Sequence, residues 1–168
     1  EDLKKKYYKK NIHISDIVPA KSQIKKFDII IFAIKPQVSK KVIDQYKNFE
    51  FKNNSVIGSI VAGKKINFFR KNIKNSNQVV RIMPNMPALI GRGVSCLTSN
   101  GNLSKANQTK INELFLKVGK TIWLKNEKQI DMATAISGSG PGYMFTLIDA
   151  FEKASQKIGF SKKISREL

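Results

Sequence analysis

The chain has 168 residues, 41% of them apolar, and its 31 Lys and Arg against 12 Asp and Glu give a formal net charge of +19. The apolar fraction is enough for a packed core and excludes a chain disordered by composition. The lone cysteine, Cys96, excludes a disulfide framework and favours a reducing compartment, so we expect a cytoplasmic protein. No apolar run approaches the roughly 20 residues of a membrane span, and residues 1–10 are too charged for a secretory signal.

The positive charge raises the alternative of a basic module that binds nucleic acid. Only four of the basic residues are arginine, and the lysines are scattered along the whole chain. Asn and Ile are also abundant, and Lys, Asn and Ile share AT-rich codons, so we interpret the charge mainly as a compositional bias on solvated faces. No specific nucleic acid and no membrane partner is expected.

Strands and helices alternate through most of the chain. Residues 2–10 look like the end of a helix, and the continuous apolar run at residues 27–34 predicts a strand buried on both faces. Further strands are predicted at residues 55–60, 78–83, 93–98 and 121–124, and helices at 38–48, 67–74 and 104–118. This alternation predicts a Rossmann-like, doubly wound α/β domain, a parallel sheet with flanking helices.

The clearest predicted helix starts at Ser104, which can cap its first turn. Its apolar residues form one stripe, at Ile111, Leu114, Phe115 and Val118. Gly119 is expected to supply a left-handed stop.

From residue 129 onward the pattern is helical only. A second apolar stripe follows Met144 along a long helix and comprises Met144, Leu147, Ile148, Phe151 and Ile158. Gly159 is expected to end this helix and Ser161 to cap another. Both ends of the chain look cut through helices, so we expect a piece of a larger fold.

Two motifs lie where predicted strands end. Pro36 pushes Lys35 out of the helical region, so the chain turns sharply where ligands bind in open α/β sheets. An ordinary strand-to-helix loop with a proline is the favoured alternative for this motif alone. The small residues of S-I-V-A-G at 59–63 would admit either a flat cofactor or a closely packed helix.

Two further motifs contain prolines. In R-I-M-P-N-M-P at 81–87 the prolines leave little freedom to Asn85, which either orients a ligand or bonds nearby backbone. In S-G-S-G-P-G-Y at 137–143 the helix start at Pro141 would favour an anion, unless this stretch is a linker. The single histidine, His13, has no obvious partner, Cys96 is expected in the core, and no metal-ligand spacing occurs.

Four motifs together resemble the pyrroline-5-carboxylate reductase family. They are D-I-I-I-F-A-I-K-P-Q at 28–37, S-I-V-A-G at 59–63, V-V-R-I-M-P-N-M-P-A-L-I-G-R-G at 79–93 and A-I-S-G-S-G-P-G-Y at 135–143. That family reduces 1-pyrroline-5-carboxylate to L-proline, in proline biosynthesis, with NADPH or NADH. The resemblance implies a partial Rossmann-like domain at 1–126 and, at 127–168, the first helices of a helical dimerisation domain. The full-length protein is then expected to be a homodimer or a higher homo-oligomer.

The resemblance also implies a division of the site. The residues expected to line the cofactor are Ala33, Ile34, Lys35, Pro36, Ile60, Val61, Ala62, Asn85 and, more loosely, Glu127. The residues expected in a substrate-side loop are Ser137, Gly138, Ser139 and Gly140. No catalytic residue and no metal is assigned, because hydride transfer to an imine requires alignment rather than a nucleophile.

The chain departs from the family pattern in places. Met86 stands where the family has Thr, and Gly142 stands where it has Ala. The family's glycine-rich turn for the pyrophosphate and its serine-proline-glycine-glycine-threonine motif do not occur in these 168 residues, so we expect this chain alone to be incomplete for activity. The alternatives are another Rossmann-type NAD(P) dehydrogenase, of the β-hydroxyacid type, and the nucleic-acid-binding module.

Overall fold

A computed structural model describes residues 18–74 and 78–168; the helix expected at residues 2–10, and His13, lie outside the described residues. Its centre is a five-stranded sheet in which each strand lies beside the next one along the chain. The strands are β1 (Ile29–Phe32), β2 (Val56–Ser59), β3 (Gln78–Met83), β4 (Gly93–Ser99) and β5 (Gly119–Trp123). The strand expected at residues 27–34 is therefore shorter than its apolar run.

The sheet is parallel except at one pair of strands. β1, β2 and β3 run parallel, β4 runs antiparallel to β3, and β5 runs parallel to β4. The predicted parallel sheet is thus mostly parallel, and β3 with β4 is the antiparallel pair. The physical reason is the short connection at residues 84–92, because a parallel return requires a crossover of a dozen or more residues.

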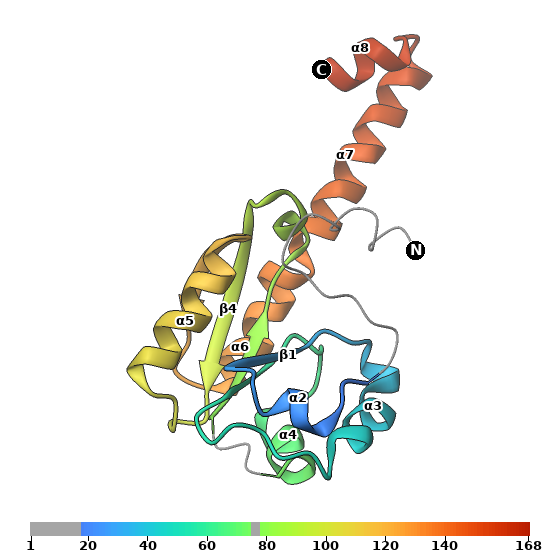
Figure 1. Cartoon of the computed structure of the whole chain (residues 1–168). Helices are drawn as coiled ribbons and strands as arrows, with labels where there is room; N and C mark the ends of the chain where they lie inside the picture. The colour runs from blue at the N-terminus through green and yellow to red at the C-terminus, as the bar shows by residue number, and fades with distance from the viewer. Residues whose placement is uncertain (1–17, 75–77) are drawn as a thin grey trace, which may run out of the picture.

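Helices cover both faces of the sheet, which confirms the Rossmann-like α/β class (Figure 1). The helices of this part are α2 (Lys21–Ile24), η1 (Pro36–Val38), α3 (Ser39–Tyr46), α4 (Ile66–Asn72), η2 (Met86–Ile90) and α5 (Lys105–Leu116). Alternate residues of the strands supply two buried clusters, as the pleat requires. Val79 belongs to the cluster under α3 and α4, and its neighbour Val80 belongs to the cluster under α5.

Phe69 is the centre of the cluster under α3 and α4. Its side chain is fully buried, and its ring lies 5.7 Å from Phe32 and 5.2 Å from Phe68, centroid to centroid. We expect Phe69→Ala to lower the free energy of unfolding by about 3–5 kcal/mol, because the cavity adds to the lost burial. Urea unfolding of the native full-length protein measures this. Phe27→Ala, on a half-exposed ring, is the control, and equal losses for both would contradict the assignment of the core.

The helix at Ser104 forms as expected, except at its end. Ser104 Oγ accepts a hydrogen bond from the backbone N–H of Asn107 at 3.3 Å, and Ile111 and Phe115 are buried. The helix ends at Leu116, and its C-cap residue, Lys117, has right-handed backbone angles. The expected stop at Gly119 is wrong: its φ of 140° opens β5, where it packs against Gly93.

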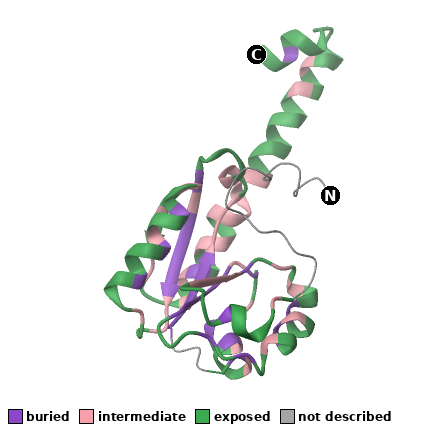
Figure 2. Cartoon of the chain, viewed as in Figure 1, coloured by how far each residue is buried: buried purple, intermediate pink, exposed green. Residues whose placement is uncertain are grey.

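The rest of the chain is helical, as the sequence predicts. Its elements are α6 (Glu127–Ala133), the π-helix η3 (Thr134–Gly138), α7 (Gly140–Lys157) and α8 (Lys162–Glu167). We call residues 127–168 the helical segment. α6 lies against the sheet, whereas α7 extends away from it and contains no buried residue (Figures 1 and 2). Within the described residues, none of the helices has the length and apolar character of a bilayer span.

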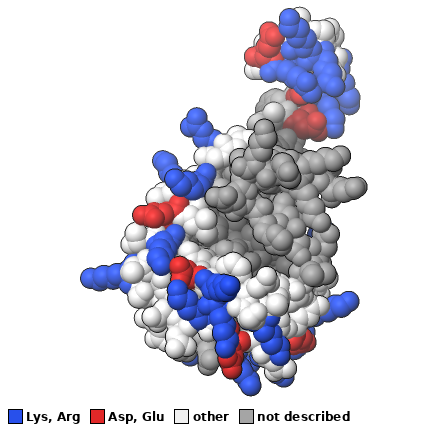
Figure 3. All heavy atoms as spheres, viewed as in Figure 1, with Lys and Arg blue, Asp and Glu red and all other residues white. Residues whose placement is uncertain are grey.

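On the face that Figure 3 shows, the lysine and arginine side chains of the described residues lie in several separate places, with acidic side chains among them. Cys96 is buried, as expected for a core cysteine, and its burial raises the pKa of the thiol. Among the residues that the structure describes, no group of His, Cys, Asp and Glu is arranged to hold a metal ion.

Candidate functional site

The residues expected to line the cofactor meet at one edge of the sheet. Phe32, Ser59 and Arg81 are paired in register across β1, β2 and β3, so the carboxyl ends of these parallel strands are aligned. Residues 33–36 leave β1 at this edge, residues 60–62 leave β2, and Asn85 follows β3. Three segments that are separate in sequence thus converge at the place where open α/β sheets bind ligands.

The side chains at this edge differ in exposure. Ala33, Lys35 and Ala62 are exposed, and Ile34, Pro36 and Ile60 are half-buried. Val61 is buried in the core, and its backbone N–H donates to Ser59 Oγ at 3.2 Å. Only the backbone of Val61 could therefore face a ligand, whereas the small exposed alanines leave room for one.

Asn85 connects the strand-end loop to the helical segment. Its Oδ1 accepts a hydrogen bond from the backbone N–H of Val94 at 2.8 Å, and its Nδ2 donates to Ser137 Oγ at 3.3 Å. Both polar atoms of the Asn85 amide therefore have partners within the protein. This agrees with the alternative that Asn85 bonds nearby backbone. A contact between Asn85 and a cofactor stays a prediction.

Ser137 and Gly138 end the π-helix, Ser139 is a turn residue and Gly140 begins α7, so these residues form neither the expected open loop nor the alternative linker. The backbone N–H of Ser139 donates to the carbonyl of Thr134 at 3.0 Å, the i→i+5 bond of a π-helix. Ser139 has right-handed backbone angles, so α7 continues a preceding helix rather than starting from a free end. Binding of an anion at the start of α7 stays a prediction. π-Helical turns are rare and are frequent at functional sites.

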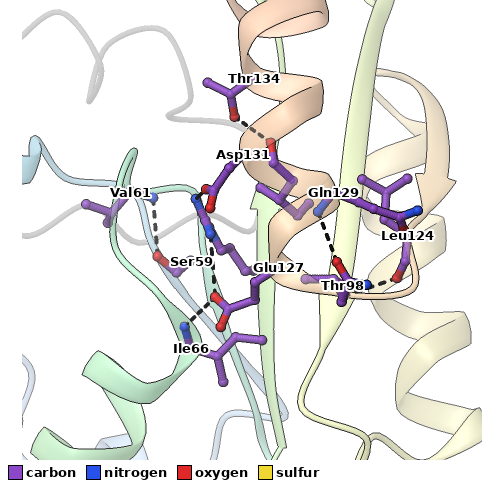
Figure 4. A network of polar contacts seen from close by, with 12 residues as sticks. Ser59, Val61, Ile66, Thr98, Leu124, Glu127, Gln129, Asp131 and Thr134 are labelled. Carbon is purple, nitrogen blue, oxygen red and sulfur yellow. Dashed lines mark hydrogen bonds and ion pairs between the residues drawn. The ribbon is translucent and has the colours of Figure 1, made fainter.

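A charged network joins the sheet to the helical segment beside these residues (Figure 4). Arg81, which is buried in β3, donates from Nη2 to Asp131 Oδ1 at 2.7 Å, and its Nη1 lies 3.5 Å from Glu127 Oε1. Glu127 Oε1 also accepts the backbone N–H of Ile66, the first residue of α4, at 2.8 Å. Glu127 therefore lies at the junction of β3, α4 and α6, and its expected contact with the cofactor stays a prediction.

Sequence reasoning missed Arg81 and Asp131 as partners, although two signals were present. Arg81 is the one charged residue of the strand Gln78–Met83, and a buried cation requires a counter-charge. Glu127 and Asp131 are acidic residues four apart on one helix, a spacing that disfavours the helix unless a cation lies between them. The two signals together predict the ion pairs.

An open α/β sheet with aligned strand ends, joined there to a helical segment, defines a Rossmann-type protein with a helical extension. The family model described as pyrroline-5-carboxylate reductase dimerisation matches residues 127–168. Pyrroline-5-carboxylate reductase from Aquifex aeolicus is 37% identical over 134 residues, which are 80% of this chain and 49% of the relative. The Arabidopsis thaliana enzyme is 32% identical over 145 residues, which are 86% of this chain and 51% of the relative.

Solved structures agree. Plasmodium falciparum pyrroline carboxylate reductase, described with NADP bound, has a TM-score of 0.81 and 30% identity, and the match covers 95% of this chain and 60% of that one. A semialdehyde dehydrogenase NAD-binding protein from Cupriavidus necator has a TM-score of 0.61 at 11% identity, a likeness of fold alone. The chain belongs to the pyrroline-5-carboxylate reductase family, and it spans about half the length of the curated relatives that it matches.

Proposed function

We propose that the native protein reduces 1-pyrroline-5-carboxylate to L-proline with NADPH or NADH, as a cytoplasmic enzyme of proline biosynthesis. The observation that carries the proposal is the identity of 30–37% to named reductases over at least four fifths of the chain. The convergence of three strand ends beside the helical segment supports it, because a nucleotide and a small substrate must meet where two structural units adjoin.

The proposed division of labour follows the geometry. The cofactor would lie along the strand-end residues 33–36 and 60–62, with Asn85 and Glu127 near its nicotinamide end. The substrate would lie toward Ser137, Gly138, Ser139 and Gly140 on the helical segment. When bound, the dihydronicotinamide would supply a hydride for the imine carbon of the substrate, whose pyrroline nitrogen would take up a proton. The chain's own residues bind and align the two reactants, which is a large share of the acceleration in such a reaction.

The test is an assay of the native full-length protein with 1-pyrroline-5-carboxylate and either NADPH or NADH. We expect loss of the dihydronicotinamide absorbance and formation of proline in equal amounts. β-Hydroxyacids with NAD or NADP serve as the comparison, and turnover of these without proline formation would refute the proposal. The 168-residue chain by itself is expected to show no turnover.

We also propose that the helical segment, with its boundary at residues 126 and 127, builds a homodimer. The match of the dimerisation model starts at residue 127, which supports both the boundary and the assembly. The exposed apolar residues of α7 support the same proposal, because contiguous apolar patches on a surface mark sites of association.

A further inference from the structure

One face of β3 and its exit contacts the helical segment at three successive points. Arg81 and Met83 alternate along β3, so they point to the same side of the sheet, and Asn85 follows two residues after the strand ends. Arg81 pairs with Asp131, and Asn85 donates to Ser137. Between these two contacts, Met83 packs against Gly138. A Cβ built on Gly138 would lie 3.0 Å from the Cε of Met83. The helical segment is thus seated along one strand.

The ion pairs of Arg81 are the charged contacts among these three. The Arg81 side chain is 5% exposed, Glu127 is 26% exposed and Asp131 is 51% exposed. A buried guanidinium is costly without counter-charge, so this side chain strongly favours the arrangement in which α6 presents both carboxylates to it. Because Glu127 Oε1 also accepts from Ile66, the same cluster fixes the start of α4.

The two ends of this cluster point to the two halves of the proposed site. Arg81 lies on the strand that leads directly into Asn85 and the cofactor edge. Asp131 lies on the helix that leads directly into the π-helix and Ser137. A movement of α6 on β3 would therefore shift the substrate side relative to the cofactor side while leaving each half folded.

We propose that Arg81 is a positioning residue for hydride transfer: through Asp131 and Glu127 it sets the distance between the bound nicotinamide and the substrate. This rests on the proposed reductase function. Misplacement of reactants by about 1 Å costs on the order of 100-fold in rate. Loss of the ion pairs should therefore lower kcat while the cofactor, bound mainly at the strand ends, keeps its affinity.

The experiment uses Asp131→Asn, Arg81→Lys and Arg81→Met in the native full-length protein. Asp131→Asn is the most informative change, because its half-exposed side chain can be altered without burying a new group. We expect kcat to fall about 10-fold for Asp131→Asn and about 100-fold for Arg81→Met. Arg81→Lys should restore part of the loss, since it keeps the charge but not the planar fork. The Kd of NADPH, measured by fluorescence, should change less than about twofold.

Asp28→Asn is the matched control. It also removes a carboxylate from an ion pair, that of Asp28 with Lys52 at 2.6 Å, and Asp28 is 51% exposed, like Asp131. It should leave kcat unchanged. Unchanged kcat in Asp131→Asn and Arg81→Lys would overturn the proposal. So would a fall in cofactor affinity and thermal midpoint that matches the fall in kcat, since that pattern indicates a structural role only.

Hydrogen exchange separates this proposal from the reductase function. If the unaltered protein reduces no 1-pyrroline-5-carboxylate, the proposed function fails. The packing of the helical segment on β3 can still be tested in the same variants, by measuring the rate of amide hydrogen exchange at residues 131–138. Faster exchange there, with the sheet unchanged, supports the positioning role of Arg81 for whatever the site binds. Unchanged exchange rejects that role.

Discussion

Replacing Leu147 and Phe151 by aspartate is expected to convert the native full-length protein from the proposed homodimer to a monomer. Both side chains lie on the apolar face of α7, and they are 49% and 68% exposed in the single chain. Covering such a side chain is worth about 1.5–3 kcal/mol, and a symmetric interface contains each change twice. Four buried aspartates would therefore outweigh the remaining contacts. Size-exclusion chromatography with light scattering measures the mass.

Lys153→Asp is the control for this prediction, because position 153 lies on the opposite face of α7 from Phe151. Its side chain is 69% exposed and pairs only locally, with Asp149. The control should remain dimeric, and circular dichroism should show the same helix content in both variants. A double variant that still forms a dimer would mean that this face is not the interface.

Gly119→Ala is expected to lower the free energy of unfolding by more than about 3 kcal/mol. A Cβ at this position would overlap the carbonyl oxygen of Gly93 and lie 2.5 Å from its nitrogen. Its φ of 140° is also a region that residues with a side chain rarely adopt. Gly93 has little room to move, because a Cβ built on it would lie 2.7 Å from the Cα of Ala88. Urea unfolding of the native full-length protein measures the loss.

Gly142→Ala is the matched control, with the opposite sign. Gly142 lies in the first turn of α7, and a Cβ there would meet nothing within 4 Å. Alanine is favoured over glycine in a helix by up to about 1 kcal/mol, so this variant should be slightly more stable. A similar loss of stability in Gly119→Ala and Gly142→Ala would show that the overlap with Gly93 does not cause the destabilisation.

Most elements were predictable from the sequence, because periodicity and turn chemistry act over a few neighbouring residues. The strand at residues 78–83 and the cap at Ser104 were predicted at their observed positions. The errors have two sources. The short connection at residues 84–92 makes β4 antiparallel to β3, and the prediction of a parallel sheet did not take its length into account. The stretch that contains Ser137 and Gly138 forms a π-helix against Met83, a contact between residues distant in sequence.

The sequence by itself determined the family, the order of strands and helices and the strand-end motifs, because these depend on short sequence motifs and on the spacing between them. Only the tertiary structure decided that Arg81 holds Asp131 and Glu127. Arg81 and Asp131 are 50 residues apart, and only the seating of α6 on β3 brings them together. The tertiary structure also decided that the apolar stripe of α7 lies exposed, because the periodicity of the sequence shows that a helix face is apolar but not what covers that face.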